Sequence, residues 1–108
     1  MKTFYPLKNY EGLYFISKDG TIKNKDRKLM SYYLSADNYH RITLMKDGKK
    51  RNHYIHILVC KQFIPNPLKL KEVDHINLKR GDNRVSNLRW TDRVGNCNNK
   101  SNNKPKLN

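Results

Sequence analysis

Four side chains in the second half of the sequence have the types and spacing for metal-assisted hydrolysis of a phosphodiester. They are Asp74 and His75, Asn87 twelve positions after the histidine, and Asn96 nine positions further on. Such hydrolysis needs an activated water, neutralisation of charge on the phosphate and stabilisation of the departing 3′ oxygen. A neutral His75 can take the water's proton near physiological pH. Asp74 and the amide oxygen of Asn96 are hard oxygen ligands suited to Mg²⁺.

The segment that carries these residues is expected to run strand, loop, strand, helix. Residues 72–76 have the composition of a short strand, residues 77–84 are polar with a Gly-Asp-Asn turn, and residues 88–90 read as the returning strand. Thr91 is expected to cap a last helix that carries Asn96. This arrangement can bring all four side chains to one point.

Asp74 and His75 raise a geometric difficulty because they are neighbours on the first predicted strand. Neighbouring side chains on a regular strand point to opposite faces, so the backbone is expected to bend there. The Asp-His pair alone is a weak signal, since such a dipeptide is usually surface. The asparagines at the stated spacing make the combination specific.

The first half of the chain is expected to form a small antiparallel sheet followed by a short helix. An Asp-Gly turn signal breaks the aromatic and β-branched run of residues 14–22, which predicts a hairpin. Residues 39–45 alternate apolar and polar and return as residues 50–54 after a second Asp-Gly turn. Apolar positions at helical spacing predict a helix over residues 55–64, which Pro65 ends.

Composition favours one small domain with a polyanionic partner. Twenty-three Lys and Arg against nine Asp and Glu give the 108-residue chain a formal charge of +14. Nucleic acid is the first candidate for such a charge. No long apolar stretch or secretory signal is present, which argues against a membrane and predicts a cytoplasmic protein. Cys60 and Cys97 lack paired spacing and are interpreted as packing thiols.

The sequence resembles the HNH endonucleases, specifically the phage and intron-encoded homing type with an N-terminal sheet module. The resemblance extends through most of the chain and rests on the segments 10–22, 39–44, 55–65, 73–76, 87–90 and residue Asn96. It implies an α+β fold in which a small antiparallel sheet and a short helix precede a ββα-metal finger. The length predicts a single domain over residues 1–108, in which the resemblance implies a DNA-binding part at 1–54 and the helix and finger at 55–97. Residues 98–108 are nearly all Asn, Lys and Ser, a composition that predicts a disordered tail.

The same resemblance assigns roles to the four residues. Asp74 and Asn96 are expected to hold one divalent ion per active site, and His75 is expected to be the general base. Asn87 is expected to hydrogen-bond across the loop and fix the orientation of the histidine. Asn96 stands where many members have histidine, and because imidazole suits zinc better, Mg²⁺ or Mn²⁺ is the expected ion.

Double-stranded DNA is the expected partner, and basic side chains on the second hairpin and around the finger are its expected contacts. A two-stranded ribbon fits the major groove, so Arg41 and Arg51 are hypothetical base readers. His56 and Trp90 are interpreted as core residues, with His56 hydrogen-bonded into the core. The main expected DNA contacts are Arg41, Lys49, Lys50, Arg51, Arg80, Arg84, Arg89 and Arg93, with Lys46 and Lys79 as further candidates.

The sequence therefore predicts a metal-dependent enzyme that nicks or cuts double-stranded DNA, without an organic cofactor. The visible sequence carries no dimer signature, which favours a monomer. Longer relatives often carry a helix-turn-helix segment after the finger, so a shorter DNA footprint is expected here. Two alternatives stay open: a catalytically silent DNA- or RNA-binding module on the same scaffold, and a basic protein bound to ribosomal RNA.

Overall fold

The structure, a computed structural model, describes residues 2–92 and has the predicted α+β fold. Two three-stranded antiparallel sheets come first, then one helix, then a two-stranded ribbon. The first sheet contains β1 (Tyr5–Pro6), β2 (Tyr14–Ile16) and β3 (Ile22–Asn24). The second contains β4 (Tyr33–Leu34), β5 (His40–Lys46) and β6 (Lys49–Tyr54). They are followed by α1 (Ile55–Phe63), β7 (Glu72–His75), the 3₁₀ turn η1 (Val85–Asn87) and β8 (Leu88–Thr91).

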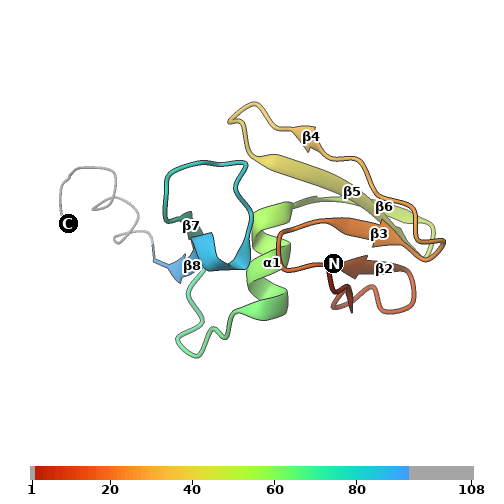
Figure 1. Cartoon of the computed structure of the whole chain (residues 1–108), viewed down its shortest axis with the longest axis horizontal. Coiled ribbons are helices and arrows are strands. Elements are labelled where there is room, and N and C mark those ends of the chain that lie inside the picture. Colours follow the sequence, from red (N-terminus) through yellow and green to blue (C-terminus); the bar gives the residue numbers. More distant parts are fainter. Residues whose placement is uncertain (1, 93–108) are drawn as a thin grey trace.

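The helix α1 stands between the N-terminal sheets and the β7–β8 ribbon, as Figure 1 shows. Its buried side chains include Ile55, Leu58 and Val59, which recur at helical spacing as the sequence predicts. The helix ends at Phe63, and Ile64 before Pro65 is already extended. One helix therefore supplies the apolar surface on which both halves of the molecule pack.

Alternating side chains of the second hairpin join this core from the sheet side. Ile42 and Leu44 are almost completely buried, whereas Thr43 between them is exposed. The β5–β6 turn has positive φ at both Asp47 and Gly48, the backbone that an Asp-Gly hairpin turn adopts. The predicted hairpin and its faces are therefore confirmed.

The loop between β7 and β8 is docked on the N-terminal half. The backbone N–H of Val85 donates to the carbonyl oxygen of Lys18 at 2.8 Å. Gly81 lies so close to the His40 ring that an added Cβ would be 2.8 Å from Nε2. Arg80 donates to the carbonyl oxygen of Asp37. The N-terminal sheets thus help to fix the loop of the ribbon.

Thr91, the expected helix cap, is the last residue of β8 and pairs with Glu72 of β7. Because an N-cap residue has extended backbone, this position is compatible with the expected cap, which stays a prediction. The helix expected beyond it, with Asn96, Arg93, Cys97 and the predicted tail, lies outside the described residues.

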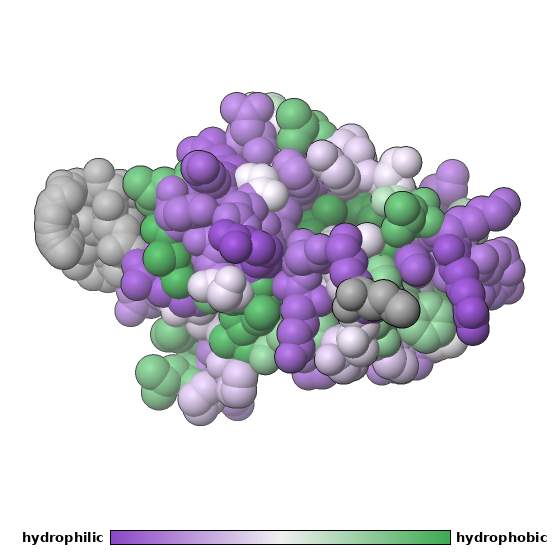
Figure 2. Space-filling model, in the orientation of Figure 1, coloured by the Kyte–Doolittle hydropathy of each residue, from purple (hydrophilic) through white to green (hydrophobic). Residues whose placement is uncertain are grey.

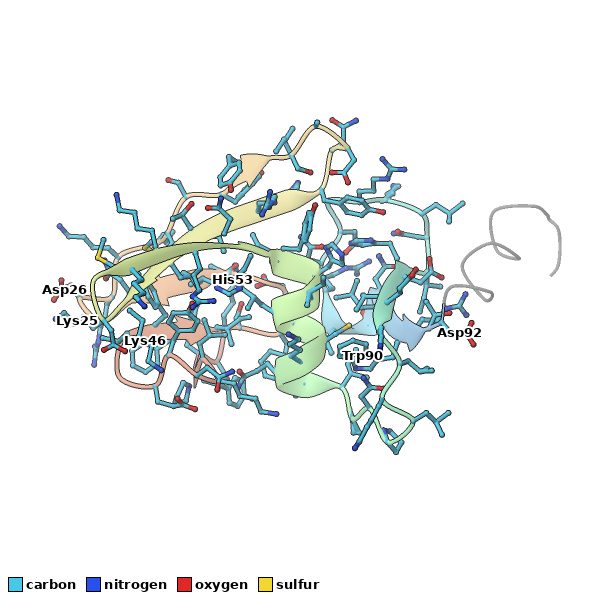
Figure 3. All side chains as sticks on the ribbon, turned by 180° about the vertical axis from the view of Figure 1, so that it is seen from behind. Lys25, Asp26, Lys46, His53, Trp90 and Asp92 are labelled. Atoms are coloured by element: carbon cyan, nitrogen blue, oxygen red, sulfur yellow. The ribbon has the colours of Figure 1, made fainter. Side chains whose placement is uncertain are left out.

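Hydrophilic side chains cover most of the face in Figure 2, with apolar patches between them. Trp90 lies beside the end of α1 in Figure 3, and its Nε1 donates to the carbonyl oxygen of Ile64 at 3.0 Å. The interpretation of Trp90 as a core residue is therefore supported. Over residues 2–92, no helix is long and apolar enough to cross a membrane.

Candidate active site

An open cavity of about 390 Å³ lies where β7 meets the end of β6 and the start of α1. Asp74 and His75, the two adjacent residues singled out from the sequence, both contribute to its wall. Its lining further includes Asp37, Tyr39, Tyr54, His56, Ile57, Lys71, Glu72, Val73, Leu78 and Arg80. The cavity is therefore walled by the finger strand on one side and by aromatic side chains of the N-terminal half on the other.

Regular pairing with β8 continues through both residues: Asp74 lies opposite Arg89, and His75 lies opposite Leu88. β7 ends at His75, so the pair lies where the strand gives way to the loop, as expected, although the pairing with β8 stays regular through both residues. The carboxylate of Asp74 accepts from Arg89 Nε at 3.0 Å and from Nη2 at 2.8 Å, both on Oδ2. Arg89 thus fixes the carboxylate on the cavity wall.

His75 is buried, with 4% of its surface exposed, and is held from several sides. Its Nε2 lies 2.9 Å from Oδ1 of Asn83 in the loop. Its ring centroid lies 4.8 Å from that of His56 and 5.8 Å from that of Tyr39. The imidazole therefore has a defined orientation at the floor of the cavity.

Asn87 organises the loop that follows His75. Its Oδ1 accepts from the backbone N–H of Asn77, and its Nδ2 donates to Asn77 Oδ1 and to the carbonyl oxygen of Asp82. The expected hydrogen bonds across the loop are present. The side chain that contacts the His75 imidazole directly is Asn83. That Asn87 fixes the orientation of His75 through the loop stays a prediction.

His56 is buried as expected, but its surroundings differ from the predicted hydrogen-bonded core. Its Nδ1 has no hydrogen-bond partner within the described part of the chain. Burial, together with the neighbouring His75, lowers the pKa of His56 to about 4. His56 is therefore neutral near pH 7 and forms an uncharged wall beside His75.

The chain that forms this cavity is similar to known proteins in sequence and in structure. A family model described as HNH endonuclease matches residues 53–96, the part of the chain that contains the cavity strand. A second model, the NUMOD4 motif, matches residues 4–45. The chain is 35% identical over 85 residues to DNA endonuclease I-HmuI of Bacillus phage SP01.

The chain belongs to the HNH endonuclease family. A solved structure titled "DNA binding and cleavage by the HNH homing endonuclease I-HmuI" superposes with a TM-score of 0.83 at 33% identity, over 91% of this chain. An uncharacterized HNH endonuclease, L245 of Acanthamoeba polyphaga mimivirus, is 36% identical over 91 residues. The alignment with the phage enzyme covers 78% of this chain, and the alignment with the mimivirus protein covers 83% of it.

This chain spans only part of those HNH relatives. It covers 49% of the phage enzyme, 26% of the mimivirus protein and 57% of the chain in the solved structure. The family assignment therefore applies to the matched region, in which the cavity lies.

Members of the HNH family typically use a divalent metal ion. Among residues 2–92, no three His, Cys, Asp or Glu side chains cluster as a metal site. The wall instead offers the Asp74 carboxylate at an open cavity. Mg²⁺ is commonly held by one or two carboxylates, with water and substrate phosphate completing its shell, so this donor set fits Mg²⁺. It does not fit a closed zinc site.

The predicted DNA-contact residues fall into two groups. Around the HNH finger, Arg80, Arg84 and Arg89 are exposed, but each has an intramolecular partner: Asp37, Asp82 and Asp74 respectively. On the second hairpin, Lys49, Lys50 and Arg51 are exposed. Arg93 lies outside the described residues.

The hairpin residues do not all share one face. Arg41 pairs with Tyr54 and Lys50 pairs with Met45, on the face opposite to Ile42 and Leu44. Arg51 pairs with the buried Leu44 and therefore lies on the other face. The hypothesis that Arg41 and Arg51 both read bases would require the two faces of the ribbon to contact DNA together.

Sequence reasoning missed Asn83 and the aromatic wall of the HNH site. The sequence predicts only a turn at Asn83, which is 5% exposed in the structure. It predicts only a hairpin for Tyr39 and Tyr54. A buried polar residue at a turn carries no periodic signal, so only the fold reveals its partner.

Proposed function

We propose that this chain is a Mg²⁺- or Mn²⁺-dependent endonuclease of the homing type that hydrolyses phosphodiester bonds in double-stranded DNA. We place it in the cytoplasm, which is that of the host cell if a phage encodes the chain. The observation that carries the proposal is the joint position of Asp74 and His75 on the wall of one open cavity. The family to which the chain belongs cleaves DNA.

His75 and Asp74 have different proposed roles in the hydrolysis. His75 takes the proton of the attacking water, whose oxygen bonds to phosphorus while the bond to the 3′ oxygen breaks and leaves a 5′ phosphate. Asp74, together with Asn96 from the segment beyond the described residues, would hold the metal ion. A bound divalent ion supplies Lewis-acid stabilisation of the charge that develops on the phosphate.

DNA would reach the cavity along the outer face of the second hairpin, defined here as the face of β5–β6 that carries Arg41, Thr43, Lys50, Asn52 and Tyr54. Tyr54 also lines the cavity, so the outer face runs directly into the cleavage centre. The Arg41 guanidinium lies 4.7 Å above the Tyr54 ring, next to this junction. Lys50 extends the positive charge along the hairpin.

The two parts of the chain would then have different tasks, as the two family matches favour. Residues 1–54 would position DNA, and residues 55–97 would supply the helix and the cleaving finger. The basic side chains would contact phosphates and fix position more than sequence.

The proposal is tested by plasmid nicking with the full chain in Mg²⁺, with a chelator control. His75→Ala should lose about 10²- to 10⁴-fold in cleavage rate, the usual contribution of a general base, while DNA affinity stays unchanged. Cleavage by His75→Ala at the parent's rate would show that the base is wrongly assigned. Absence of metal-dependent nicking by the parent would favour the alternative below.

The alternative is a catalytically silent DNA- or RNA-binding module, and one observation favours it. Asp74 is already engaged by Arg89, an arrangement that would also stabilise the ribbon without a metal ion. Such a module would bind nucleic acid with the salt dependence of a basic protein but leave plasmid intact.

A further inference from the structure

A buried hydrogen bond inside the cavity wall assigns a role to a residue that the family comparison does not name. His75 and Asn83 are 4% and 5% exposed, and Nε2 of the imidazole lies 2.9 Å from Oδ1 of the amide. A carbonyl oxygen can only accept a hydrogen bond, so the proton of the pair must be on Nε2. We propose that Asn83 is a positioning residue that holds His75 as the Nε2-protonated tautomer, which makes Nδ1 the basic atom. This inference rests on the proposed nuclease function for its catalytic meaning.

The tautomer matters because it decides which imidazole nitrogen carries the lone pair that can take a proton. A neutral histidine has one donor and one acceptor nitrogen, and the hydrogen bond made by one nitrogen selects the state of the other. With Nε2 donating to Asn83, the lone pair that can take a proton from water is on Nδ1. The rings of His56 and Tyr39, at centroid distances of 4.8 and 5.8 Å, hinder a flip that would reverse this choice.

Asn83 is itself held by the first hairpin. A Cβ added to Gly20, in the β2–β3 turn, would lie 3.1 Å from the Cβ of Asn83, so the two backbones are in close contact. Two residues further on, the Val85 N–H donates to the carbonyl oxygen of Lys18, in the same turn. The first hairpin thus contacts the loop at Asn83 and Val85 and helps to fix the position from which the Asn83 amide reaches His75.

The loop contains a second asparagine network, which makes a specific control possible. Asn77 accepts from the Lys79 N–H and from Asn87 Nδ2, and it donates to Asp82. These bonds shape the same loop without contacting the imidazole. Asn77→Ala therefore disturbs the loop while leaving the His75–Asn83 bond in place.

The test is ¹⁵N NMR of the histidine rings in the full chain without metal, at pH 8.5. The His75 resonances are assigned by their loss in His75→Gln. We expect the Nε2–H tautomer in the parent, in Asn77→Ala and in Asn83→Asp, which keeps an acceptor oxygen. Asn83→Leu, similar in size but without an acceptor, should give a mixture of tautomers. An Nδ1–H tautomer in the parent, or an unchanged Nε2–H tautomer in Asn83→Leu, overturns the proposal.

Cleavage rates with saturating Mg²⁺ and DNA provide the second arm. Asn83→Leu should lose about 10²-fold or more in single-turnover rate with the dissociation constant for DNA unchanged, and Asn83→Asp should recover most of that loss. Equal losses in Asn83→Leu and Asn83→Asp would contradict a positioning role. If Asn83→Leu does not fold, as thermal unfolding would show, Asn83→Ala, which also lacks an acceptor, takes its place in both arms. Failure of the parent to cleave DNA would refute the proposed function, whereas the NMR result would still decide the tautomer.

Discussion

Arg89 reaches across the β7–β8 ribbon and holds Oδ2 of Asp74 with two nitrogens, at 3.0 and 2.8 Å. The pair follows directly from the strand register, in which Asp74 and Arg89 lie opposite each other. A guanidinium that donates two hydrogen bonds to one carboxylate oxygen limits the rotation of that carboxylate. Asp74 is the proposed metal ligand. Arg89 therefore orients a metal ligand in addition to linking the two strands of the ribbon.

Arg89→Ala should therefore weaken the use of metal more than it weakens the fold. Removing a group that orients a metal ligand typically costs about 10- to 100-fold in metal affinity or activity. We expect a rise of that order in the Mg²⁺ concentration that gives half-maximal cleavage, measured with saturating DNA. The melting temperature should change little, because exposed ion pairs contribute little to stability.

Arg84→Ala is the matched control for this prediction. Arg84 forms a similar exposed pair with Asp82 at 2.8 Å, but Asp82 does not line the cavity. This variant should leave the Mg²⁺ dependence unchanged. If the two variants shifted the Mg²⁺ dependence equally, the effect would come from lost positive charge and not from Asp74.

Two adjacent residues of β6 test the proposed DNA path. Lys50 lies on the outer face of the second hairpin, whereas Arg51 pairs with the buried Leu44 on the opposite face. Lys50→Ala should reduce the slope of log K against log salt concentration by about 0.9, the value for one lost phosphate contact. Arg51→Ala should change this slope much less. Fluorescence anisotropy with a DNA duplex at several salt concentrations measures both, and a larger effect at Arg51 would place DNA on the other face.

Much of the fold could be predicted because its signals are local. Ile42 and Leu44 alternate with exposed residues, since one face of the hairpin is buried, and this gives a period of two. The β5–β6 turn contains Asp47-Gly48, whose backbone has positive φ at both positions. Pro65 likewise marks the helix end because it restricts the residue before it.

The arrangement within the site could be predicted only in part. The types and spacing of Asp74, His75 and Asn87 single them out in the sequence. The side chain that contacts His75 cannot be predicted in the same way, because it depends on how the loop folds back. Asn83 comes eight residues after His75, inside a turn whose sequence only signals a change of direction. Asn83 and Asn87 lie close together in the sequence, and no local rule predicts which of the two side chains contacts the imidazole of His75.

Gly20→Ala should disturb the support of Asn83 as well as the turn. Gly20 has φ of +89°, and a new Cβ would lie 3.0 Å from Ile55 Cγ2 and 3.1 Å from Asn83 Cβ. Gly12→Ala is the control, because Gly12 has φ of +83° but nothing within 4 Å of the new Cβ. Backbone strain should cost each variant about 1 kcal/mol or more, and crowding should cost Gly20→Ala a further 1–3 kcal/mol, roughly. Thermal unfolding should therefore show a melting temperature at least about 4 °C lower for Gly20→Ala than for Gly12→Ala. Equal melting temperatures would mean that the turn and the loop are not in firm contact.

Buried His56 should make the protein less stable as the pH falls below neutrality. Its folded pKa is about 4, lowered first by burial and then by His75, while Asp37 acts in the opposite direction. The unfolded chain, with an ordinary histidine pKa near 6.5, binds more protons between these two values. The stabilisation is therefore fully present above about pH 6.5 and is lost progressively as the pH falls toward 4, by up to roughly 3 kcal/mol.

Urea unfolding between pH 7 and pH 4.5 measures this dependence, with His56→Phe as the comparison. The phenyl ring can keep the packing against Tyr39 and Tyr54, whose rings lie 4.9 and 5.4 Å from that of His56, but it cannot bind a proton. The variant should have a shallower fall in unfolding free energy than the parent. His40 and His53, whose pKa values are also lowered by burial, keep its slope from reaching zero. Identical slopes in the two proteins would show that His56 gains its proton without cost, which requires an opening of the cavity wall beside His75.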